Sequence, residues 1–368
     1  MTEWKEYKLK DVANVKYGKA HQSLSDGYIP AYGSGGLIRY VEKALYNEES
    51  ILIPRKGTLN NIIYKEEPFW TVDTMFWTEL NKKIIVPKYL FYQLSLIDFS
   101  NMNVGSAVPS MTIPILNDID IYVPSIPEQT AIASILSSLD DKIDLLHRQN
   151  ATLEKMAETL FRQWFVEEAK EEWENCVLED LCSQINSGGT PSTKIETYYN
   201  GNINWYSTKE LNDNYLFESI SKITQDGLEN SAAKLFPKGT VLIAIYAAPT
   251  VGRLGILGNQ SAFNQAACGL IANDKICCKE FIYLYLKNQR NELNAMASGS
   301  AQQNLNVGKI KTYPAFIPDD ITMNKFKREI IPFFEKIEKN AMQIRTIKAL
   351  RDTLLPKLMS GEVRVEPD

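Results

Sequence analysis

The stretch of residues 126–164, IPEQTAIASILSSLDDKIDLLHRQNATLEKMAETLFRQW, decides the fold of this chain. Residues 128 to 173 contain neither Gly nor Pro, and Pro127 stands where the first turn of a helix tolerates it. Apolar side chains recur here at alternating spacings of four and three, the heptad pattern of a helix that buries one stripe. About 40 helical residues span on the order of 60 Å, so this helix needs a partner helix to cover the stripe.

The partner lies near the C-terminus, where the apolar stripe returns at a shift of 194 residues. Pro332 and Pro356 interrupt this second helix, so kinks are expected there. Asn150 and Asn340 are polar positions in the stripes that can fix the register of the pair. The alternative, two ordinary core helices of separate domains, fits the length and the heptad spacing less well. The expected helix-pair seam comprises Ile132, Leu136, Leu139, Ile143, Leu146, Leu153, Leu160, Phe326, Ile330, Phe333, Ile337, Ile344, Ile347 and Leu354.

The whole chain is a duplication. Trp4, Leu9 and Asp11 match Trp173, Leu178 and Asp180 at an offset of 169, and the offset is 190 at residues 51–53. It settles at 194 from Gly105-Ser106-Ala107, which returns as Gly299-Ser300-Ala301. The second copy therefore carries about 25 extra residues, all before the Gly-Ser-Ala stretch. Variable first parts and constant last parts suit a protein that recognises something in two halves.

We expect a mixed α/β (α+β) chain of two similar globular heads joined by two long antiparallel helices, with pseudo-twofold symmetry. The segments are a first head at 1–125, a first helix at 126–172, a second head at 173–318, and a second helix with a C-terminal tail at 319–368. Apolar runs between Gly, Asn and Ser turns predict strands at Ile51–Pro54, Ile62–Tyr64, Val241–Tyr246 and Arg253–Leu257. Short amphipathic helices are predicted at Lys88–Leu96 and Lys279–Leu286.

Composition is that of a soluble globular protein, with 44% apolar and 23% charged residues. There is no long apolar run and no apolar signal region after Met1, so we expect a cytoplasmic protein. The five cysteines show no Cys-x-x-Cys spacing and are expected to be reduced thiols. The net charge of −5 arises mostly in residues 126–172, with 5 basic and 10 acidic residues, so the heads are neutral. Bulk charge neither supports nor excludes DNA binding.

Both heads are rich in side chains that bind phosphates or base edges. Arg55-Lys56-Gly57 leaves a predicted strand into a turn, where a basic side chain can reach a groove. Amides suit adenine and arginine suits guanine, whereas each single residue is also plausible as a solvated loop side chain. The candidate DNA-binding residues are Lys19, His21, Tyr32, Ser34, Arg39, Arg55, Lys56, Asn60 and Asn61 in the first head, and Thr190, Ser192, Lys194, Ser207, Lys209, Tyr246, Arg253, Gln302, Gln303, Asn304 and Asn306 in the second.

The sequence lacks the motifs of catalysis. Its two histidines, His21 and His147, lie in different segments, so sequence neighbours cannot form a His-centred metal site or triad. It has no phosphate-binding Gly-rich loop, no dinucleotide turn, and no Asn-Pro-Pro-Tyr run of the kind that amino-methyltransferases use. We therefore expect no catalytic residues, no metal and no cofactor on this chain.

The chain resembles the specificity subunit of type I restriction-modification systems. Four stretches carry the resemblance: the repeated Trp-x-x-x-x-Leu-x-Asp at Trp4 and Trp173, Ser-Gly-Gly-Thr-Pro-Ser at Ser187–Ser192, the helix entry at Ile126–Ile132, and the C-terminal stretch Leu350–Val363. The first head departs from the family pattern, with Tyr-Gly-Lys-Ala at residues 17–20 in place of the Gly-Thr-Pro stretch. Base contacts therefore cannot be copied from one head to the other.

The resemblance implies that each head is a target-recognition domain for one half of a split, asymmetric sequence in double-stranded DNA. It implies that the helix pair sets the gap and docks two modification (methyltransferase) subunits, which bring S-adenosylmethionine and methylate an adenine. Restriction subunits using ATP and Mg would join them, so this chain would be no enzyme itself. Alternatives are a duplicated coiled-coil adaptor that binds only protein, a DNA-binding subunit of another modification system, or a self-contained methyltransferase or nuclease, against which the missing motifs argue.

Overall fold

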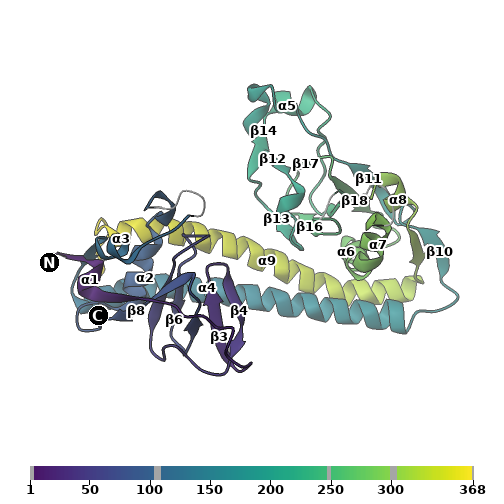
Figure 1. Cartoon of the computed structure of the whole chain (residues 1–368). Helices are drawn as coiled ribbons and strands as arrows, with labels where there is room; N and C mark the ends of the chain where they lie inside the picture. The colour runs from purple at the N-terminus through teal and green to yellow at the C-terminus, as the bar shows by residue number, and fades with distance from the viewer. Residues whose placement is uncertain (1–3, 103–108, 247–249, 299–304, 367–368) are drawn as a thin grey trace. The chain divides into compact units, whose positions relative to one another are not determined.

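The computed structural model describes residues 4–102, 109–246, 250–298 and 305–366 (Figure 1). The chain divides into two compact units, of which unit 1 comprises residues 1–144 and 346–368 and unit 2 residues 145–345. Unit 1 is therefore built from both ends of the chain, whereas unit 2 is one continuous segment. The Gly-Ser-Ala stretches at 105–107 and 299–301 lie outside the described residues.

The head of unit 1 contains a four-stranded sheet of order β2-β8-β5-β6, a three-stranded sheet of order β4-β3-β7 and the pair β1-β9. Its elements are β1 (Lys5–Lys8), α1 (Leu9–Val12), β2 (Ala13–Tyr17), β3 (Ile29–Gly33), β4 (Gly36–Val41), β5 (Ser50–Pro54), β6 (Ile63–Lys65), β7 (Trp70–Thr71), β8 (Met75–Leu80), α2 (Pro87–Ser95), η1 (Phe99–Met102), α3 (Ile113–Asn117) and β9 (Asp120–Val123). The strand β5 is buried along its whole length, as its run of apolar residues predicts.

The head of unit 2 contains a five-stranded sheet of order β11-β18-β15-β16-β13, a three-stranded sheet of order β14-β12-β17 and the pair β10-β19. Its elements are β10 (Glu174–Val177), β11 (Cys182–Ser187), η3 (Glu196–Tyr198), β12 (Tyr199–Tyr206), η4 (Thr208–Glu210), β13 (Asn214–Leu216), β14 (Ser221–Ile223), α5 (Gln225–Glu229), β15 (Val241–Ala244), β16 (Leu254–Leu257), β17 (Ala262–Phe263), β18 (Ala267–Ala272), α6 (Lys279–Asn288), α7 (Arg290–Ser298), α8 (Val307–Lys311) and β19 (Pro314–Ile317).

The two heads share one topology. Insertions in the head of unit 2 explain why the offset between equivalent residues increases along the chain. Two residues separate β3 from β4, whereas 14 residues, including η4 and β13, separate the equivalent strands β12 and β14. Eight residues join β4 to β5, whereas 17 residues, including α5, join β14 to β15. These two insertions account for the drift of the offset from 169 to 190. The strand β13 adds a parallel edge to the larger sheet of unit 2, which unit 1 lacks.

One large side chain has changed strands between the two heads. In unit 1, Ala31 of β3 pairs with Trp70 of β7, whereas in unit 2 Trp205 of β12 pairs with Ala262 of β17. Both indoles donate a hydrogen bond to the backbone carbonyl at the equivalent position, Trp70 to Lys19 and Trp205 to Gly189, each at 2.9 Å. In both heads, therefore, an indole bonds the equivalent carbonyl. It comes from β7 in unit 1, but in unit 2 it comes from β12, the equivalent of β3.

A glycine leaves the first strand of the larger sheet in both heads, at Gly18 and Gly188. A Cβ on Gly18 would lie 2.0 Å from the carbonyl oxygen of Val72, and one on Gly188 would lie 2.0 Å from that of Phe263. Because the atoms that a Cβ would meet belong to the backbone and cannot move aside, neither position can hold a residue with a side chain. Tyr17-Gly18-Lys19 therefore occupies the place of the Ser-Gly-Gly stretch, although the sequences differ.

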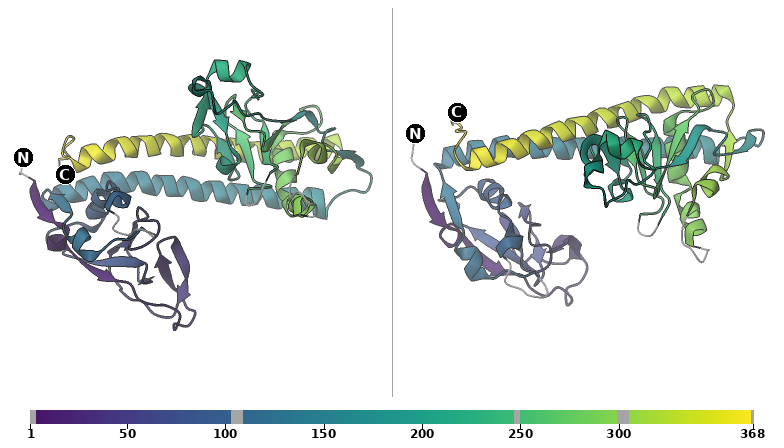
Figure 2. Two further views of the ribbon diagram at one scale, coloured as in Figure 1. Left: turned by 45° about the horizontal axis from the view of Figure 1, so that its top comes forward. Right: turned by 90° about the horizontal axis from the view of Figure 1, so that it is seen from above.

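Two long helices, α4 (Ile126–Arg162) and α9 (Asp320–Met359), contribute to both units and pack together in antiparallel directions (Figure 2). In unit 2, Asn340 Nδ2 donates to Asn150 Oδ1 at 2.8 Å, and Trp164 lies against Phe326. In unit 1, Arg351 of α9 pairs with Asp140 of α4 at 2.7 Å. The helix α9 runs unbroken through Pro332 and Pro356, and both prolines lie at exposed positions.

The expected seam residues all lie at buried or half-buried positions. The ones that are fully or almost fully buried are Ile132, Leu136, Ile143, Leu146, Phe326, Ile330 and Ile344, and those at intermediate positions are Leu139, Leu153, Leu160, Phe333, Ile337, Ile347 and Leu354. Asn340 is 1% exposed, so its bond to Asn150 satisfies an amide that water hardly reaches.

Asn150→Ala is expected to lower the free energy of unfolding by about 1 to 3 kcal/mol, because it leaves the buried amide of Asn340 short of a partner. Chemical unfolding of the full chain, followed by circular dichroism, measures the change. Replacing both asparagines with leucine is expected to be nearly neutral. Lys155→Ala, at an exposed position on α4, serves as the control and should change the unfolding midpoint little. An equal loss in the single and the double variant would contradict this account.

The first long helix ends earlier than the sequence predicts. A π-helical turn, η2 (Gln163–Glu167), follows α4, and Glu168 ends it by donating its backbone N–H to the carbonyl of Gln163. The predicted helical residues 169–172 therefore lie outside the helix. The wider turn places Phe165 among aromatic rings of unit 2, namely those of Phe161, Trp173, Phe281, Phe316 and Phe326. Burial of that ring among its neighbours favours the turn.

The tail after α9 closes on the beginning of the chain within unit 1. Arg364 makes charge-assisted hydrogen bonds of 2.6 and 2.9 Å to the two oxygens of Glu128, a residue of α4 that is 4% exposed. The same guanidinium lies 5.6 Å above the indole of Trp4. Because a buried carboxylate needs such a partner, Arg364 ties the tail to α4 within unit 1.

The predicted fold class is confirmed, as are the four predicted strands and two predicted short helices, which the structure has as β5, β6, β15, β16, α2 and α6. The five cysteines are free thiols, and burial raises the pKa of Cys268 and of Cys277 to about 12. A thiol with so high a pKa is a poor nucleophile near neutral pH. Among the described residues, no helix combines the length and the apolarity needed to cross a membrane.

Candidate nucleic-acid interface

Three segments of unit 1 meet beyond the end of β5, and we name this place the β5 corner. It comprises Arg55–Gly57, the turn at Asp73–Thr74 and the segment Pro109–Met111. Arg55 donates its backbone N–H to the carbonyl of Thr74 at 2.8 Å and accepts one from Met111 at 2.8 Å. Gly57 donates to Pro109 at 3.1 Å. The backbone that carries Arg55 is therefore held on two sides, which a side chain that must meet a ligand in one geometry requires.

The side chain of Arg55 is oriented but keeps most of its donors. Its guanidinium lies 5.2 Å from the ring centroid of Tyr17, and Nη1 donates to the backbone carbonyl of Asp73 at 3.2 Å. A guanidinium has five N–H donors in a planar fork. These two contacts orient the group and leave most of its donors free for other acceptors. The sequence gives no sign of the contact with Tyr17, since 37 residues lie between the two positions.

Two other candidate residues, Ser34 and Asn61, adjoin the β5 corner, and a third, Lys56, lies within it. Asn61 Nδ2 donates to the carbonyl of Ser34 at 2.9 Å, which draws the β3–β4 turn toward the segment after β5. Gly57 has a φ of +86° and lies against the Ser34 hydroxyl. Lys56 is exposed and pairs through its backbone with Ser110. Ser34, Arg55, Lys56 and Asn61 therefore form one polar surface. Lys65, which lies 5.3 Å from the ring of the candidate Tyr32, was not expected.

The remaining candidates of unit 1 have other partners. Lys19 has an exposed side chain, and its backbone N–H donates to the carbonyl of Thr71 in β7 at 2.8 Å. His21 is half-buried, with an Nδ1 that lacks a hydrogen-bond partner. Arg39 is committed to Asp26 and the carbonyl of Leu24, and Asn60 donates to Asp98 at 2.8 Å. Hydrogen bonds from Ser100 and Asn60 lower the pKa of Asp98.

Unit 2 has an equivalent corner with different side chains. Ile245 follows β15 as Arg55 follows β5, and it donates its N–H to Ala266 at 2.8 Å, as Arg55 does to Thr74. Ile245 is fully buried, whereas the next residue, Tyr246, is 37% exposed. Thr190 adjoins this corner through a hydrogen bond to the side chain of Gln265. The two corners thus have equivalent backbone hydrogen bonds but carry different side chains.

The other candidates of unit 2 are dispersed. Ser192, Lys194 and Lys209 are exposed. Arg253 Nη1 donates to Asn212 Oδ1 at 3.3 Å, and the Asn306 side chain caps α8 by accepting from Lys309 at 2.9 Å. The candidates Gln302, Gln303 and Asn304 lie outside the described residues.

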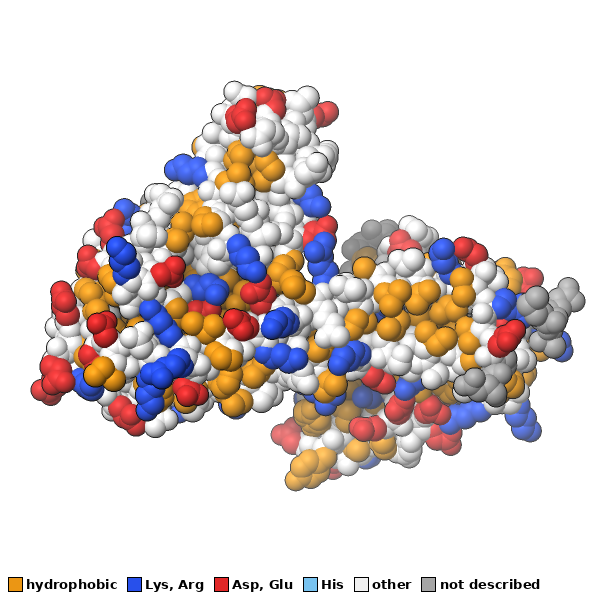
Figure 3. All heavy atoms as spheres, turned by 180° about the vertical axis from the view of Figure 1, so that it is seen from behind, with side chains coloured by type: hydrophobic (Ala, Val, Ile, Leu, Met, Phe, Trp, Pro, Cys, Tyr) orange, Lys and Arg blue, Asp and Glu red, His pale blue; other side chains and the backbone are white. Residues whose placement is uncertain are grey.

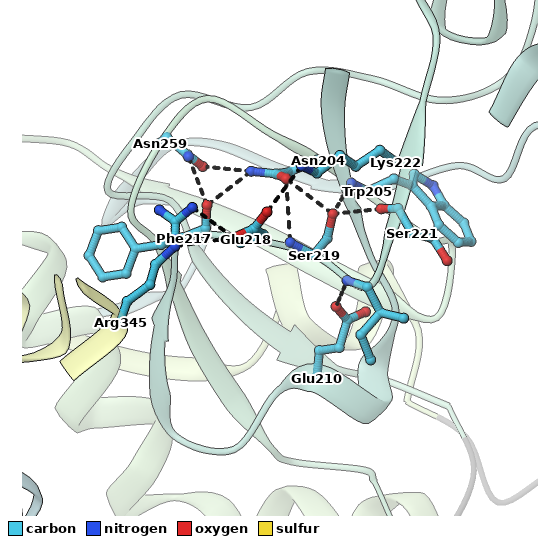
Figure 4. A network of polar contacts seen from close by, with 11 residues as sticks. Asn204, Trp205, Glu210, Phe217, Glu218, Ser219, Ser221, Lys222, Asn259 and Arg345 are labelled. Atoms are coloured by element: carbon cyan, nitrogen blue, oxygen red, sulfur yellow. Dashed lines mark hydrogen bonds and ion pairs between the residues drawn. The ribbon is translucent and has the colours of Figure 1, made fainter. Parts of the chain in front are cut away.

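The insertion between β12 and β14 is fixed by a polar network within unit 2 (Figure 4). Glu210 accepts hydrogen bonds from the backbone of Ser207 and of Ile220, both at 2.8 Å, and from the Ser207 hydroxyl at 3.0 Å. Arg345 of α9 pairs with Glu218 of the insertion at 2.7 Å. The hydroxyl of Ser207 therefore has a structural task as the cap of η4. An insertion held this way presents a defined surface instead of a loose loop.

A second set of charges ties this insertion to the helices of unit 2. Arg290 makes hydrogen bonds of 2.9 and 2.5 Å to the two oxygens of Asp213. Burial alone would raise the pKa of Asp213, but the hydrogen bonds and charge of Arg290 outweigh it and lower that pKa. Lys287 of α6 joins Glu154 of α4 at 2.5 Å. These charges are satisfied internally, so they are poor candidates for contacts with an external anion.

The surface offers an interspersed charge pattern. Figure 3 shows Lys and Arg side chains among Asp, Glu and apolar ones on the face in view. On this face a ligand would therefore meet individual positioned side chains more than a broad basic field. In the part of the chain that the structure describes, no group of three or more His, Cys, Asp or Glu is placed to hold a metal ion.

Comparison with known proteins gives a consistent result. The family model described as "Type I restriction modification DNA specificity domain" matches residues 1–155 and 170–350. The chain is 27% identical to the type I restriction enzyme MjaIX specificity subunit of Methanocaldococcus jannaschii, over 97% of this chain and 86% of that protein. It is 22% identical to the HindI specificity subunit of Haemophilus influenzae, over 99% and 100%. The crystal structure of the S subunit from M. genitalium shares the fold, with a TM-score of 0.66 at 15% identity over 97% of this chain and 96% of that one.

Proposed function

This chain belongs to the family of DNA specificity domains of type I restriction-modification systems, and on that premise we propose that each of its heads recognises one half of a bipartite, asymmetric DNA target. The chain is the specificity subunit and the non-catalytic component of such a complex. The observation that supports two half-sites most strongly is the shared topology of the heads with unlike side chains at equivalent corners. Two similar backbones with different recognition surfaces suit two unlike sequences.

The DNA-contacting surface that we propose is centred on the two corners. In unit 1 it includes Ser34, Arg55, Lys56 and Asn61, with Lys19, Tyr32 and Lys65 beside them. In unit 2 it includes Thr190, Ser192, Lys194 and Tyr246. Exposed lysines would contact phosphates and set the register on the duplex, whereas Arg, Asn and Tyr would contact base edges. Arg39, Ser207 and Asn306 are weaker candidates, because each already makes structural bonds.

We propose the partners from the family alone. Two modification subunits would dock on the helix pair, bring S-adenosylmethionine and flip an adenine out of the duplex for methylation. Restriction subunits with ATP and Mg would join the complex, in the cytoplasm. In this proposal the present chain supplies sequence recognition, and the chemistry takes place on the partner chains.

Lengthening the helix pair tests whether α4 and α9 set the spacing between the half-sites. One heptad added to both helices, near Leu146 in α4 and near the facing Ile344 in α9, adds about 10 Å of rod. We expect the gap in the recognised sequence to grow by about three base pairs, because duplex DNA rises about 3.4 Å per base pair. Mapping methylated adenines in cells that express the variant with its partner subunits measures the gap.

The matched control for this experiment adds one heptad to α4 alone. That change puts the two apolar stripes out of register, so assembly and methylation are expected to be lost instead of shifted. Methylation at an unchanged gap by the variant with two added heptads would show that the helices do not set the spacing.

A binding experiment separates the proposed function from its alternatives. The assembled complex of this chain with its modification subunits is titrated onto random duplexes, and the bound fraction is sequenced. We expect enrichment of one bipartite sequence. Binding without sequence preference at every salt concentration would favour the protein-only adaptor. Methyl transfer by the purified chain without partners would instead indicate a self-contained enzyme.

A further inference from the structure

Two arginines of the heads, Arg55 and Arg253, differ from the other arginines outside α4 and α9 in their hydrogen-bond partners. Outside α4 and α9, the described arginines Arg39, Arg290 and Arg364 are paired with carboxylates, at 3.5, 2.5 and 2.6 Å. Arg55 and Arg253 have no carboxylate within ion-pair distance among the residues that the structure places. Arg253 is bonded to the neutral side chain of Asn212, and Arg55 to a backbone carbonyl. Their charge is therefore available to an external acceptor.

Arg55 is the better placed of the two for a specific contact. Its backbone is held by Thr74 and Met111, and its guanidinium is set against the ring of Tyr17. The Nη1 contact with Asp73 leaves donors on Nη2 and Nε, so a pair of parallel N–H groups remains for a bidentate acceptor. A side chain that is already oriented loses less conformational entropy on binding. Lys56, next to it, is an exposed point charge without such a fork.

The equivalent position in unit 2 cannot make the same contact. Ile245 holds the same backbone place through its bond to Ala266, but its side chain is apolar and fully buried. The next residue, Tyr246, is 37% exposed, but its single hydroxyl has no fork of donors. Guanine is distinguished in the major groove by two adjacent acceptors, O6 and N7. At this position, unit 1 has a side chain with a matching pair of donors, and unit 2 does not.

We propose that Arg55 reads a guanine in the half-site of unit 1 through a bidentate contact with O6 and N7, and that Ile245, at the equivalent position of unit 2, cannot make this contact. The inference rests on the proposed function, and it names a specificity-determining residue of that surface. It follows that the two half-sites differ at equivalent positions: a guanine is selected by the head of unit 1, and a base chosen by other means is selected by the head of unit 2.

The test uses the complex of the full chain with its modification subunits on its mapped target. Each guanine of the target is replaced in turn by 7-deazaguanine, which lacks the N7 acceptor but still pairs with cytosine. For the wild type, we expect the replacement of one guanine, in one half only, to weaken binding by about 5- to 150-fold. For Arg55→Gln, the same replacement is expected to cost nothing further, and other bases become tolerated at that position.

Two further variants keep the result interpretable. Arg55→Lys retains the charge without the planar fork, so it should weaken the guanine preference, but less than Arg55→Gln does, because an ammonium can still donate to O6 and N7. Lys56→Gln should weaken binding to all sequences about equally and reduce the dependence of log K on log salt by about one unit. Melting curves and circular dichroism of each variant establish that it is folded.

The outcomes separate failure of the inference from failure of the proposed function. If the 7-deazaguanine penalty persists undiminished in both Arg55 variants, Arg55 does not read that base. If Arg55→Gln weakens all sequences equally and lowers the salt dependence, Arg55 is a phosphate contact. Both results overturn the inference while the wild type still selects a sequence. A wild-type complex without any sequence preference would instead refute the proposed function.

Discussion

Phe326→Ala is expected to lower the free energy of unfolding of unit 2 by about 3 to 5 kcal/mol. Phe326 is fully buried on α9, and its ring lies within 6.2 Å of those of Phe161 on α4, Trp164 on η2 and Phe281 on α6. Removing it leaves a cavity where three helices meet, and neighbouring rings with fixed backbones cannot collapse to fill it. Hydrogen exchange of the full chain, read by mass spectrometry, should show faster exchange in α6 and in the first half of α9.

Ile321→Ala is the control for this prediction. Ile321 lies on the same helix but is 82% exposed, so its truncation should change stability by less than about 0.5 kcal/mol. A loss confined to α9, with α6 unaffected, would contradict the role of Phe326 as the contact that joins the head of unit 2 to its helices.

Trp70→Ala is expected to destabilise the head of unit 1 by about 3 to 5 kcal/mol, because it removes a large buried side chain and leaves the carbonyl of Lys19 without its donor. The other head shows how the loss can be repaired. Adding Ala31→Trp to Trp70→Ala reproduces the arrangement of Trp205 and Ala262, so the double variant should recover much of the lost stability. Thermal unfolding and hydrogen exchange in β3 and β7 measure both changes.

Ala31→Trp alone is the matched control for the double variant. With Trp70 still in place, the second indole overpacks the sheet, so this variant should be less stable than the wild type. Recovery in the double variant but not in either single variant would establish the exchange between strands. A double variant that is as unstable as Trp70→Ala would show that the surroundings of the two heads have diverged too far for it.

The helices and the most apolar strands could be predicted because their signals are local. The heptad stripe of α4 needs only neighbouring turns of one helix, and the buried strands β5 and β15 are continuous apolar runs. The short strand β7 could not be predicted, since two residues carry no period and its partner β3 is distant in the sequence. The early end of α4 was missed for the same reason, because the aromatic rings around Phe165 come from segments far along the chain.

The candidate site was predictable only as a region. Arg55 and Lys56 stood out because a basic pair follows a buried strand, but the contact of Arg55 with Tyr17 depends on the tertiary fold. Sequence alone also could not separate polar residues that bond within the protein from polar residues that are free to contact a ligand. Ser207 and Asn306 had the composition expected of DNA contacts, yet both cap helices. A side chain that bonds its own backbone looks the same in the sequence as one that faces a ligand.

The bond between Arg364 and Glu128 has a consequence for how the protein is made. On the ribosome, the head of unit 1 is synthesised first, yet the guanidinium that neutralises the buried carboxylate of Glu128 emerges only after all of unit 2. Unit 2 can complete its core while translation continues, whereas unit 1 must wait until residue 364 has emerged. Synthesis that stalls shortly before residue 364 should therefore release chains whose first-made part is the less protected against proteases.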